Sequence, residues 1–240
     1  MRQTRGNYRA SSVIFMFAAV LLTGCAGAAD PGAGGSTAVA ATPSATRPPA
    51  SETPAPAPAV TVDSLVVRSE GIDLGRTDGS SETYGYFDDT QTTIDALTVA
   101  FGSDPVVEDV VPERETGPGT TYTWPGVVIT DPDTEGNAPF ESEYWIAVTA
   151  ASLNNVDLQT VDGIQVGDSA PALEAAYPDG ATRISVGGGP ERLDVNVDTV
   201  GLPARDSVEA GELTFSVWLI APDPSGELNE FRAPSPNFEN

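Results

Sequence analysis

The stretch of sequence that decides the fold is RLDVNVDT, residues 192–199. Leu193, Val195 and Val197 alternate with polar residues along it. Alternation with a period of two is typical of a strand that turns one face to the core and the other to water. The stretch therefore predicts a sheet with a solvated face.

A similar residue pattern extends over most of the chain after residue 60. β-Branched residues alternate there with Gly, Pro and Asp turns, which indicates a succession of short strands. The other predicted strands are residues 60–67, 121–130, 143–150, 155–161 and 212–220.

Two segments are predicted as helices. Residues 90–101 have an apolar side, a cap among residues 88–90 and Gly102 just after the end. Residues 169–177 have Leu173 on their apolar side and end before a proline. Both helices are short, so neither persists in water without a sheet to lie on.

The two helices indicate an internal duplication. Residues 97–102 match residues 173–178, and residues 71–75 match residues 163–167, with an insertion in the first copy around residues 76–90. The fold class expected is α+β, a tandem repeat of a short helix-plus-antiparallel-sheet unit. Chance similarity between short segments is the alternative, because no long identical run supports the match.

The boundaries that follow from this organisation divide the chain into five parts. Two of them are the repeats, and the other three are a leader, a tether and a flexible C-terminal tail. In chain order they are residues 1–24, 25–59, 60–161, 162–221 and 222–240.

One helix followed by a meander of strands resembles the β-lactamase-inhibitor-protein-like fold and the small envelope lipoproteins of the BamE/SmpA type. The matching positions are Gly163, Ile164, Val166, Gly167, Leu173 and Tyr177, within about residues 63–220. The resemblance implies a binding module without a catalytic centre. The chain has a single cysteine and lacks the disulfides of the inhibitors, so inhibition of a β-lactamase is not implied.

The first residues of the chain predict export and lipidation. Arginines begin the segment, residues 13–22 are an apolar run, and Leu22-Thr23-Gly24-Cys25 resembles the bacterial lipobox. Cys25 is the expected lipidation site, which places the protein at the cell membrane, anchored in the bilayer on its extracytoplasmic side. An uncleaved membrane anchor is the alternative, but the run has about half of the roughly 20 residues that a spanning helix needs.

The composition limits the function classes. The formal charge is −24, or −27 once the three leader arginines are removed, and no lysine or histidine is present. Such a chain repels nucleic acid, so no nucleic-acid partner is expected. The usual general bases are missing, so an enzyme is not expected. The predicted function is non-catalytic binding of an envelope protein or polymer, and the alternative is a calcium- or carboxylate-dependent envelope enzyme.

A calcium site is the first candidate site. Asp131, Asp133 and Glu135 place carboxylates at alternate positions before a glycine, as an EF-hand-like loop does. Ser142 stands where such a loop needs a bidentate glutamate. The alternative is an acidic hairpin loop, and no cofactor other than calcium is expected.

An aromatic surface is the second candidate site. Tyr84, Tyr86 and Phe87 lie in the inserted stretch among small polar residues, and exposed aromatic rings are good contact surfaces. Trp218 alternates onto the side opposite its apolar neighbours and is the tryptophan expected to be exposed. These four residues are the predicted ligand-binding positions, and burial of the rings in the core is the alternative.

Overall fold

The computed structural model describes residues 59–112, 117–133, 142–185, 188–202 and 213–237. All of them belong to one compact unit, Ala55–Asn240. The predicted lipidation site, Cys25, and the other residues that precede this unit lie outside the described residues.

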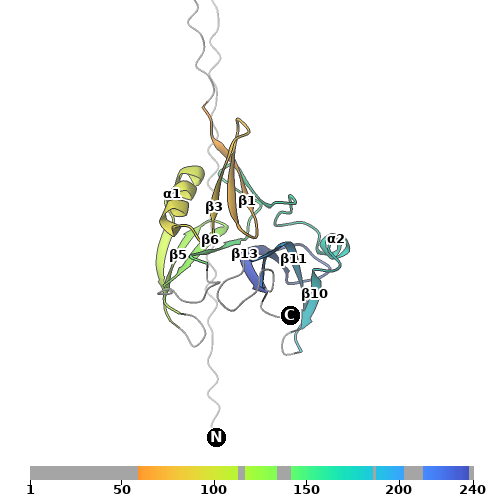
Figure 1. Cartoon of the computed structure of the whole chain (residues 1–240). Helices are drawn as coiled ribbons and strands as arrows, with labels where there is room; N and C mark the ends of the chain where they lie inside the picture. Colours follow the sequence, from red (N-terminus) through yellow and green to blue (C-terminus); the bar gives the residue numbers. More distant parts are fainter. Residues whose placement is uncertain (1–58, 113–116, 134–141, 186–187, 203–212, 238–240) are drawn as a thin grey trace, which may run out of the picture. The chain divides into compact units, whose positions relative to one another are not determined.

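The smaller of two sheets has five strands (Figure 1). Their order is β3 (Ser81–Gly85), β2 (Gly71–Arg76), β1 (Val62–Val67), β9 (Val156–Thr160) and β8 (Ser152–Leu153). β1 and β9 are parallel, and the other neighbours are antiparallel.

The larger sheet has eight antiparallel strands. Their order is β10 (Ala181–Ser185), β11 (Glu191–Gly201), β12 (Thr214–Ala221), β13 (Glu230–Asn237), β7 (Trp145–Val148), β6 (Val127–Pro132), β5 (Gly119–Trp124) and β4 (Val106–Val110). The four strands that follow α2 along the chain lie side by side, and so do the four that precede β8; β13 joins the two groups, because it pairs with β12 on one side and with β7 on the other.

This architecture corrects the predicted α+β tandem repeat. The described residues form thirteen strands and only two helices, so the fold is mostly β. The two predicted repeats do not have a sheet each: residues 106–148 and 181–237 build one sheet together. Residues 71–75 lie in β2, whereas residues 163–167, their supposed match, are not in a strand. Short local similarity therefore gave a false signal of duplication.

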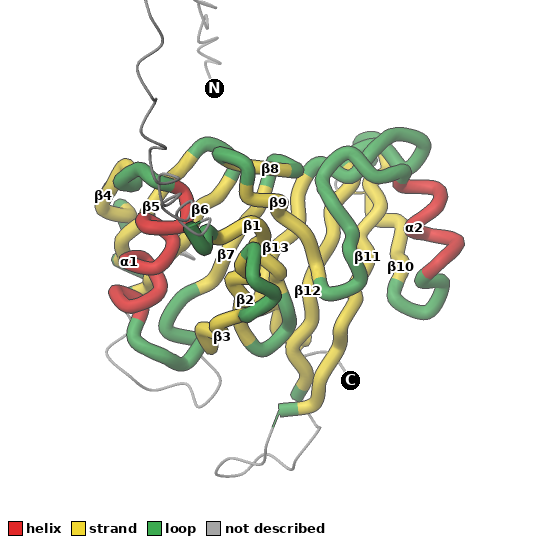
Figure 2. The backbone as a smooth tube through the Cα atoms, turned by 90° about the horizontal axis from the view of Figure 1, so that it is seen from above, coloured by secondary structure: helices red, strands yellow, loops and turns green. Residues whose placement is uncertain are grey.

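The core lies between the two sheets. Side chains from the facing sides of both sheets form one apolar cluster, which includes Leu65, Ile72, Val195 and Leu219. Figure 2 shows β1, β2 and β3 lying across the large sheet, with the helices near its two ends. Burial of this cluster is the main source of stability for a fold that has no disulfide.

Helix α1 (Thr90–Phe101) agrees with its predicted bounds. The Asp89 carboxylate caps its first turn by accepting hydrogen bonds from the backbone N–H and the hydroxyl of Thr92, at 3.0 and 2.9 Å. Gly102 ends it with φ of 66°, a conformation that glycine adopts without a Cβ penalty. Phe101, in its last turn, packs edge-on against Trp124 with centroids 5.5 Å apart.

Helix α2 (Ala170–Ala176) also lies where the sequence predicts a helix, with Pro171 in its first turn. Only Ala170 and Leu173 are buried in its seven residues. It covers the end of the large sheet beside β11.

Polar contacts also join the two sheets. Asp198 in β11 accepts hydrogen bonds from the backbone N–H and the hydroxyl of Ser69, at 2.8 and 3.1 Å. Asp198 has a φ of 50°, at a point where the register of β11 and β12 shifts. The bulge turns this carboxylate toward the small sheet.

The segment predicted as a flexible C-terminal tail, residues 222–240, contains β13 in the middle of the large sheet. The sequence does not predict this strand, because Pro234 and Pro236 cannot donate hydrogen bonds to a neighbouring strand and so argue against a central position in a sheet. Pro234 lies where the pairing of β12 and β13 shifts register, and Pro236 lies opposite Phe215, beyond the part of β13 that pairs with β7.

Candidate functional site

The large sheet has a second face, turned away from the core. In β11, β12 and β13 the core cluster takes alternate residues such as Val195, Val217 and Phe231. Because successive side chains point to opposite faces of a strand, Trp218 and Arg232 lie on the other side. Trp218 and Arg232 are partly exposed there. We call this side the outer face, and its side chains are candidates for contacts with a ligand because they are not part of the core.

Four side chains form a row across the outer face, which we call the Trp–Arg ladder: Arg192, Trp218, Arg232 and Trp145. The Arg192 guanidinium carbon lies 5.4 Å from the centroid of the Trp218 ring. The guanidinium carbon of Arg232 lies 5.7 Å from the same centroid and 6.0 Å from that of Trp145. The ladder therefore joins four neighbouring strands, β11, β12, β13 and β7.

Strand register explains why these residues meet. Trp218 and Arg232 are direct partners in the pairing of β12 with β13. Arg232 pairs with Ala147, which makes Trp145 its diagonal neighbour, within reach of a long side chain. Both tryptophans are intermediate in exposure, and the two arginine side chains are 37% and 42% exposed. The ladder is thus partly open to solvent.

The ladder has little net charge. Arg192 donates a hydrogen bond to Asp194 at 2.9 Å, and Arg232 is paired with Glu230. A guanidinium that is already paired still attracts the face of an indole ring and presents its remaining N–H groups as donors. The outer face therefore offers flat rings, donors and acceptors without an excess of either sign.

One polar pair in the ladder is incompletely satisfied. Asp194 is 5% exposed, and its Oδ1 atom has no hydrogen-bond partner among the protein atoms. The Nε atom of Arg192 is also buried and without a partner. Buried polar atoms without partners are uncommon and cost stability, which marks this end of the ladder as unusual.

Two of the four residues predicted to form an aromatic contact surface are buried, and the other two are not. Tyr84 is 9% exposed and Tyr86 is fully buried, so both have the alternative role of core residues. Tyr86 donates a hydrogen bond to the Arg68 carbonyl at 2.9 Å, and burial raises its pKa well above 10. Phe87 is 41% exposed and stacks on Phe215, with ring centroids 5.8 Å apart. The four predicted rings therefore do not form one surface.

The inserted stretch that carries three of those rings is not an irregular loop. Residues 81–85 form β3, which pairs along its length with β2 and buries Tyr84 opposite Ile72. Trp218 is the one predicted contact residue that lies on the outer face, and it occupies the centre of the ladder.

The predicted calcium loop is only partly described, because Glu135 lies outside the described residues. Asp131, in β6, lies near Asp133, Glu143 and Asp89 at the start of α1. Burial raises the pKa of Asp131, and the neighbouring carboxylates raise it further, against a hydrogen bond from Thr90. Within the described ranges, no group of three or more acidic, His or Cys side chains has an arrangement that could hold a metal ion.

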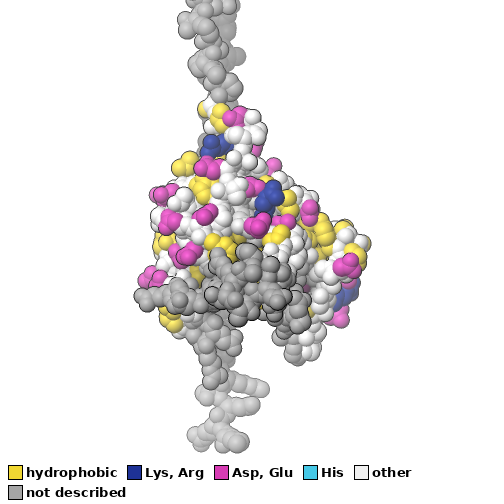
Figure 3. All heavy atoms as spheres, in the orientation of Figure 1, with side chains coloured by type: hydrophobic (Ala, Val, Ile, Leu, Met, Phe, Trp, Pro, Cys, Tyr) yellow, Lys and Arg dark blue, Asp and Glu magenta, His cyan; other side chains and the backbone are white. Residues whose placement is uncertain are grey.

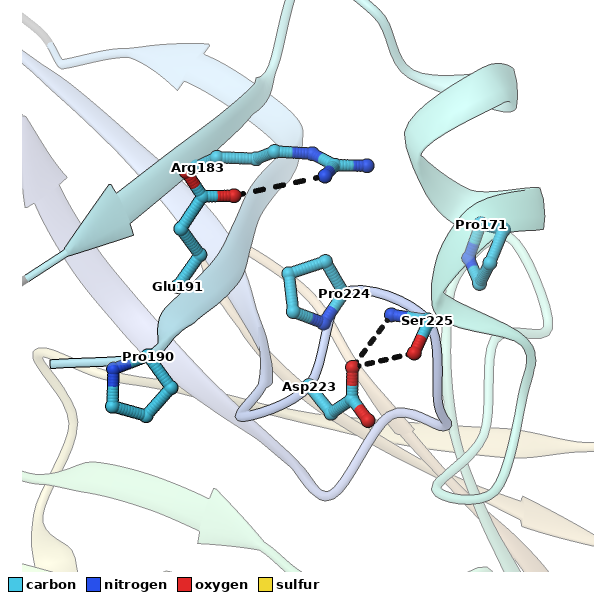
Figure 4. A pocket seen from close by; sticks show the side chains of 7 residues that line it. All are labelled: Pro171, Arg183, Pro190, Glu191, Asp223, Pro224 and Ser225. Atoms are coloured by element: carbon cyan, nitrogen blue, oxygen red, sulfur yellow. Dashed lines mark hydrogen bonds and ion pairs between the residues drawn. The ribbon is translucent and has the colours of Figure 1, made fainter.

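A hollow of about 440 Å³ lies where α2 approaches β10 and the turn before β13 (Figure 4). Its charged groups are engaged within the protein. Arg183 donates to Glu174 through two nitrogen atoms, each at 2.7 Å, and lies 3.7 Å from Glu191. Asp223 accepts from the backbone N–H and the hydroxyl of Ser225, at 2.9 and 2.7 Å.

The surface has the charge that the composition predicts. Figure 3 shows acidic side chains spread over the visible face, with few basic ones among them. Two of the eight arginines that follow residue 24 are in the ladder, and each is paired with a carboxylate.

In a comparison with known proteins, no family model, no curated protein and no solved structure matches the chain. In the part of the chain that the structure describes, neither helix has the length and apolarity to cross a bilayer. The function therefore has to be argued from the outer face and from the sequence.

Proposed function

We propose that this protein is a lipid-anchored extracytoplasmic binding module without catalysis, and that the outer face binds a neutral polysaccharide of the cell envelope. The single observation that carries the proposal is the Trp–Arg ladder. Two partly exposed indole rings and two guanidinium groups, spread over four strands, are not needed to build the core, because the inner face already supplies it.

The chemistry of the ladder favours sugar rings. Tryptophan presents a broad apolar face with little conformational entropy to lose, which suits the C–H faces of a pyranose. The Arg192 and Arg232 guanidinium groups and their paired carboxylates supply donors and acceptors for hydroxyl groups at the ring edges. A hydroxyl is both donor and acceptor, so a neutral sugar satisfies both.

Charge argues against an anionic polymer. The mature chain carries −27, and each ladder arginine is already paired with a carboxylate. An anionic polymer would meet repulsion at long range and no unpaired cation at the ladder. A neutral polymer meets neither obstacle.

The binding experiment is a calorimetric titration of the full mature chain, in detergent, with dextran as a neutral polysaccharide and polygalacturonate as an anionic one. Dextran binding that is lost in Trp218→Ala supports the proposal. The matched control is Arg183→Ala, which removes an arginine paired with carboxylates away from the ladder. Stronger binding of polygalacturonate, or equal loss in both variants, would contradict it.

Lipid anchoring is tested separately. Cys25→Ser removes the only sulfur that can accept the lipid, so the precursor should stay unlipidated and largely unprocessed. Metabolic labelling with a radioactive fatty acid measures this. Normal processing and labelling of the variant would refute the lipid anchor without touching the polysaccharide proposal.

A further inference from the structure

β4 is an open edge of the large sheet. Among the described strands it pairs only with β5, so one side of its backbone has no partner in any of them. Residues Val106 to Asp109 are all exposed, and Val110 is half-buried. An open edge of this kind presents backbone N–H and C=O groups that can pair with another chain.

The β4 edge is also apolar. The structure describes seven large apolar side chains as exposed, and three of them lie in residues 106–111: Val106, Val107 and Val111, at 62%, 56% and 78%. Proteins usually protect an edge strand with charges, prolines or a covering segment. Exposed valines do not protect an edge in this way. Their β-branched side chains instead favour the extended backbone that an added strand needs.

The other described edges differ from β4. β10, at the far end of the same sheet, carries Arg183, which is engaged by Glu174 and Glu191. β3 exposes Ser81, Glu82 and Thr83, which are polar. β8, the other edge of the small sheet, consists of exposed Ser152 and buried Leu153. Of the four described edges, only β4 combines an open backbone with exposed apolar side chains.

We propose that the β4 edge is a docking site for an extended protein segment with two adjacent basic residues between apolar ones, added as a further strand. Glu108 and Asp109 stand at the centre of the edge, between the valines. The ion pairs of the described chain include neither carboxylate. Two neighbouring cations opposite them make favourable cross-strand pairs on both faces of the added strand.

The same carboxylates argue against a second copy of this chain as the occupant. If two β4 strands paired antiparallel over residues 106–110, Glu108 would face Glu108 of the other copy, and Asp109 would face Val107. Directly opposed like charges destabilise a strand pair. The edge is therefore selective: its acids repel its own copy and attract a basic segment.

The experiment uses the full mature chain in detergent and two capped peptides, one with the sequence TVVKKVVT and the other TVVEEVVT. Calorimetry should show binding of the basic peptide that is at least about tenfold tighter than that of the acidic one. The double variant Glu108→Lys, Asp109→Lys should reverse this preference. Both substituted side chains are exposed, and an unchanged melting temperature would verify that the variant is folded.

Hydrogen exchange locates the peptide. With the basic peptide bound, exchange should slow at backbone N–H groups within residues 106–110 and stay unchanged in β10. The basic peptide with every backbone nitrogen methylated keeps its charges but cannot donate strand hydrogen bonds, so it should not bind. Equal affinity for both unmethylated peptides, undiminished binding of the methylated one, or protection elsewhere would overturn the proposal. Because the ladder is not involved, these results are independent of the polysaccharide titration.

Discussion

The two faces of the large sheet are made by the same strands and differ in what their side chains do. On the inner face, residues such as Val195, Val217 and Phe231 pack against the small sheet and are at most 1% exposed. On the outer face, Trp218 and Arg232 contact each other and remain partly exposed. A period of two thus allows one strand to stabilise the fold on one side and to leave side chains partly exposed on the other.

The inner face should respond most strongly to substitution. Leu97, in α1, is fully buried in the core, and Leu97→Ala leaves a cavity that should cost about 3 kcal/mol of unfolding free energy. Leu173, in α2, is 7% exposed near the end of the sheet, where a neighbouring element has more room to close the gap. Leu173→Ala should therefore cost less, about 2 kcal/mol. Urea denaturation measures both, and a change under about 0.5 kcal/mol at either site would mean that its helix does not pack as described.

The outer face should respond less. Trp218→Ala removes a partly exposed ring and two cation–π contacts, which together should cost about 1 to 2 kcal/mol. The same urea measurement compares it with Leu97→Ala. A loss as large as that of Leu97→Ala would mean that the ladder serves mainly as a second core.

The smallest effect is expected at the acidic cluster beside α1, and it depends on pH. The pKa of Asp131 is raised in the folded state, so the folded protein binds a proton at this carboxylate more tightly than the unfolded chain does. Stability from this group is therefore greatest at low pH and falls as the pH rises through the folded-state pKa. Asp131→Asn should raise the melting temperature at pH 7, and the gain should vanish below the unfolded value of about 3.8.

Asp78 provides a control of opposite sign. Hydrogen bonds from the hydroxyl and the backbone N–H of Ser80 lower the pKa of Asp78, so its contribution to stability is present above its unfolded pKa and is lost on acidification. Asp78→Asn should slightly lower the melting temperature at pH 7. If both substitutions shifted the melting temperature in the same direction, net charge rather than local environment would be the cause.

Local signals in the sequence predicted the elements that they govern. A cap among residues 88–90, which the structure identifies as Asp89, and Gly102 predicted the bounds of α1, and alternation predicted β11. β13 was missed because its prolines contradict the usual rule for a central strand. The pattern also implied that the polar side of β11 is fully solvated, whereas Asp194 is buried beside Arg192.

The ladder itself was not predictable beyond Trp218. Its four residues come from strands that are far apart in sequence, and only the order β11, β12, β13 and β7 brings them together. That order depends on β13 entering between β12 and β7, which no local pattern encodes. Tyr84 shows the converse: the composition of its segment suggested a contact surface, but the pairing of β3 with β2 turned this ring inward.

The most direct test of the outer face uses the three tryptophans of the chain, which give three indole N–H signals in a proton–nitrogen NMR spectrum. Trp145 and Trp218 belong to the ladder, whereas Trp124 is 1% exposed and donates its indole N–H to the Ser103 carbonyl at 2.9 Å. Addition of dextran should shift the signals of Trp145 and Trp218 together and leave that of Trp124 in place. No shift at the two ladder tryptophans at saturating dextran, or an equal shift of all three, would contradict the assignment of the outer face as the binding surface.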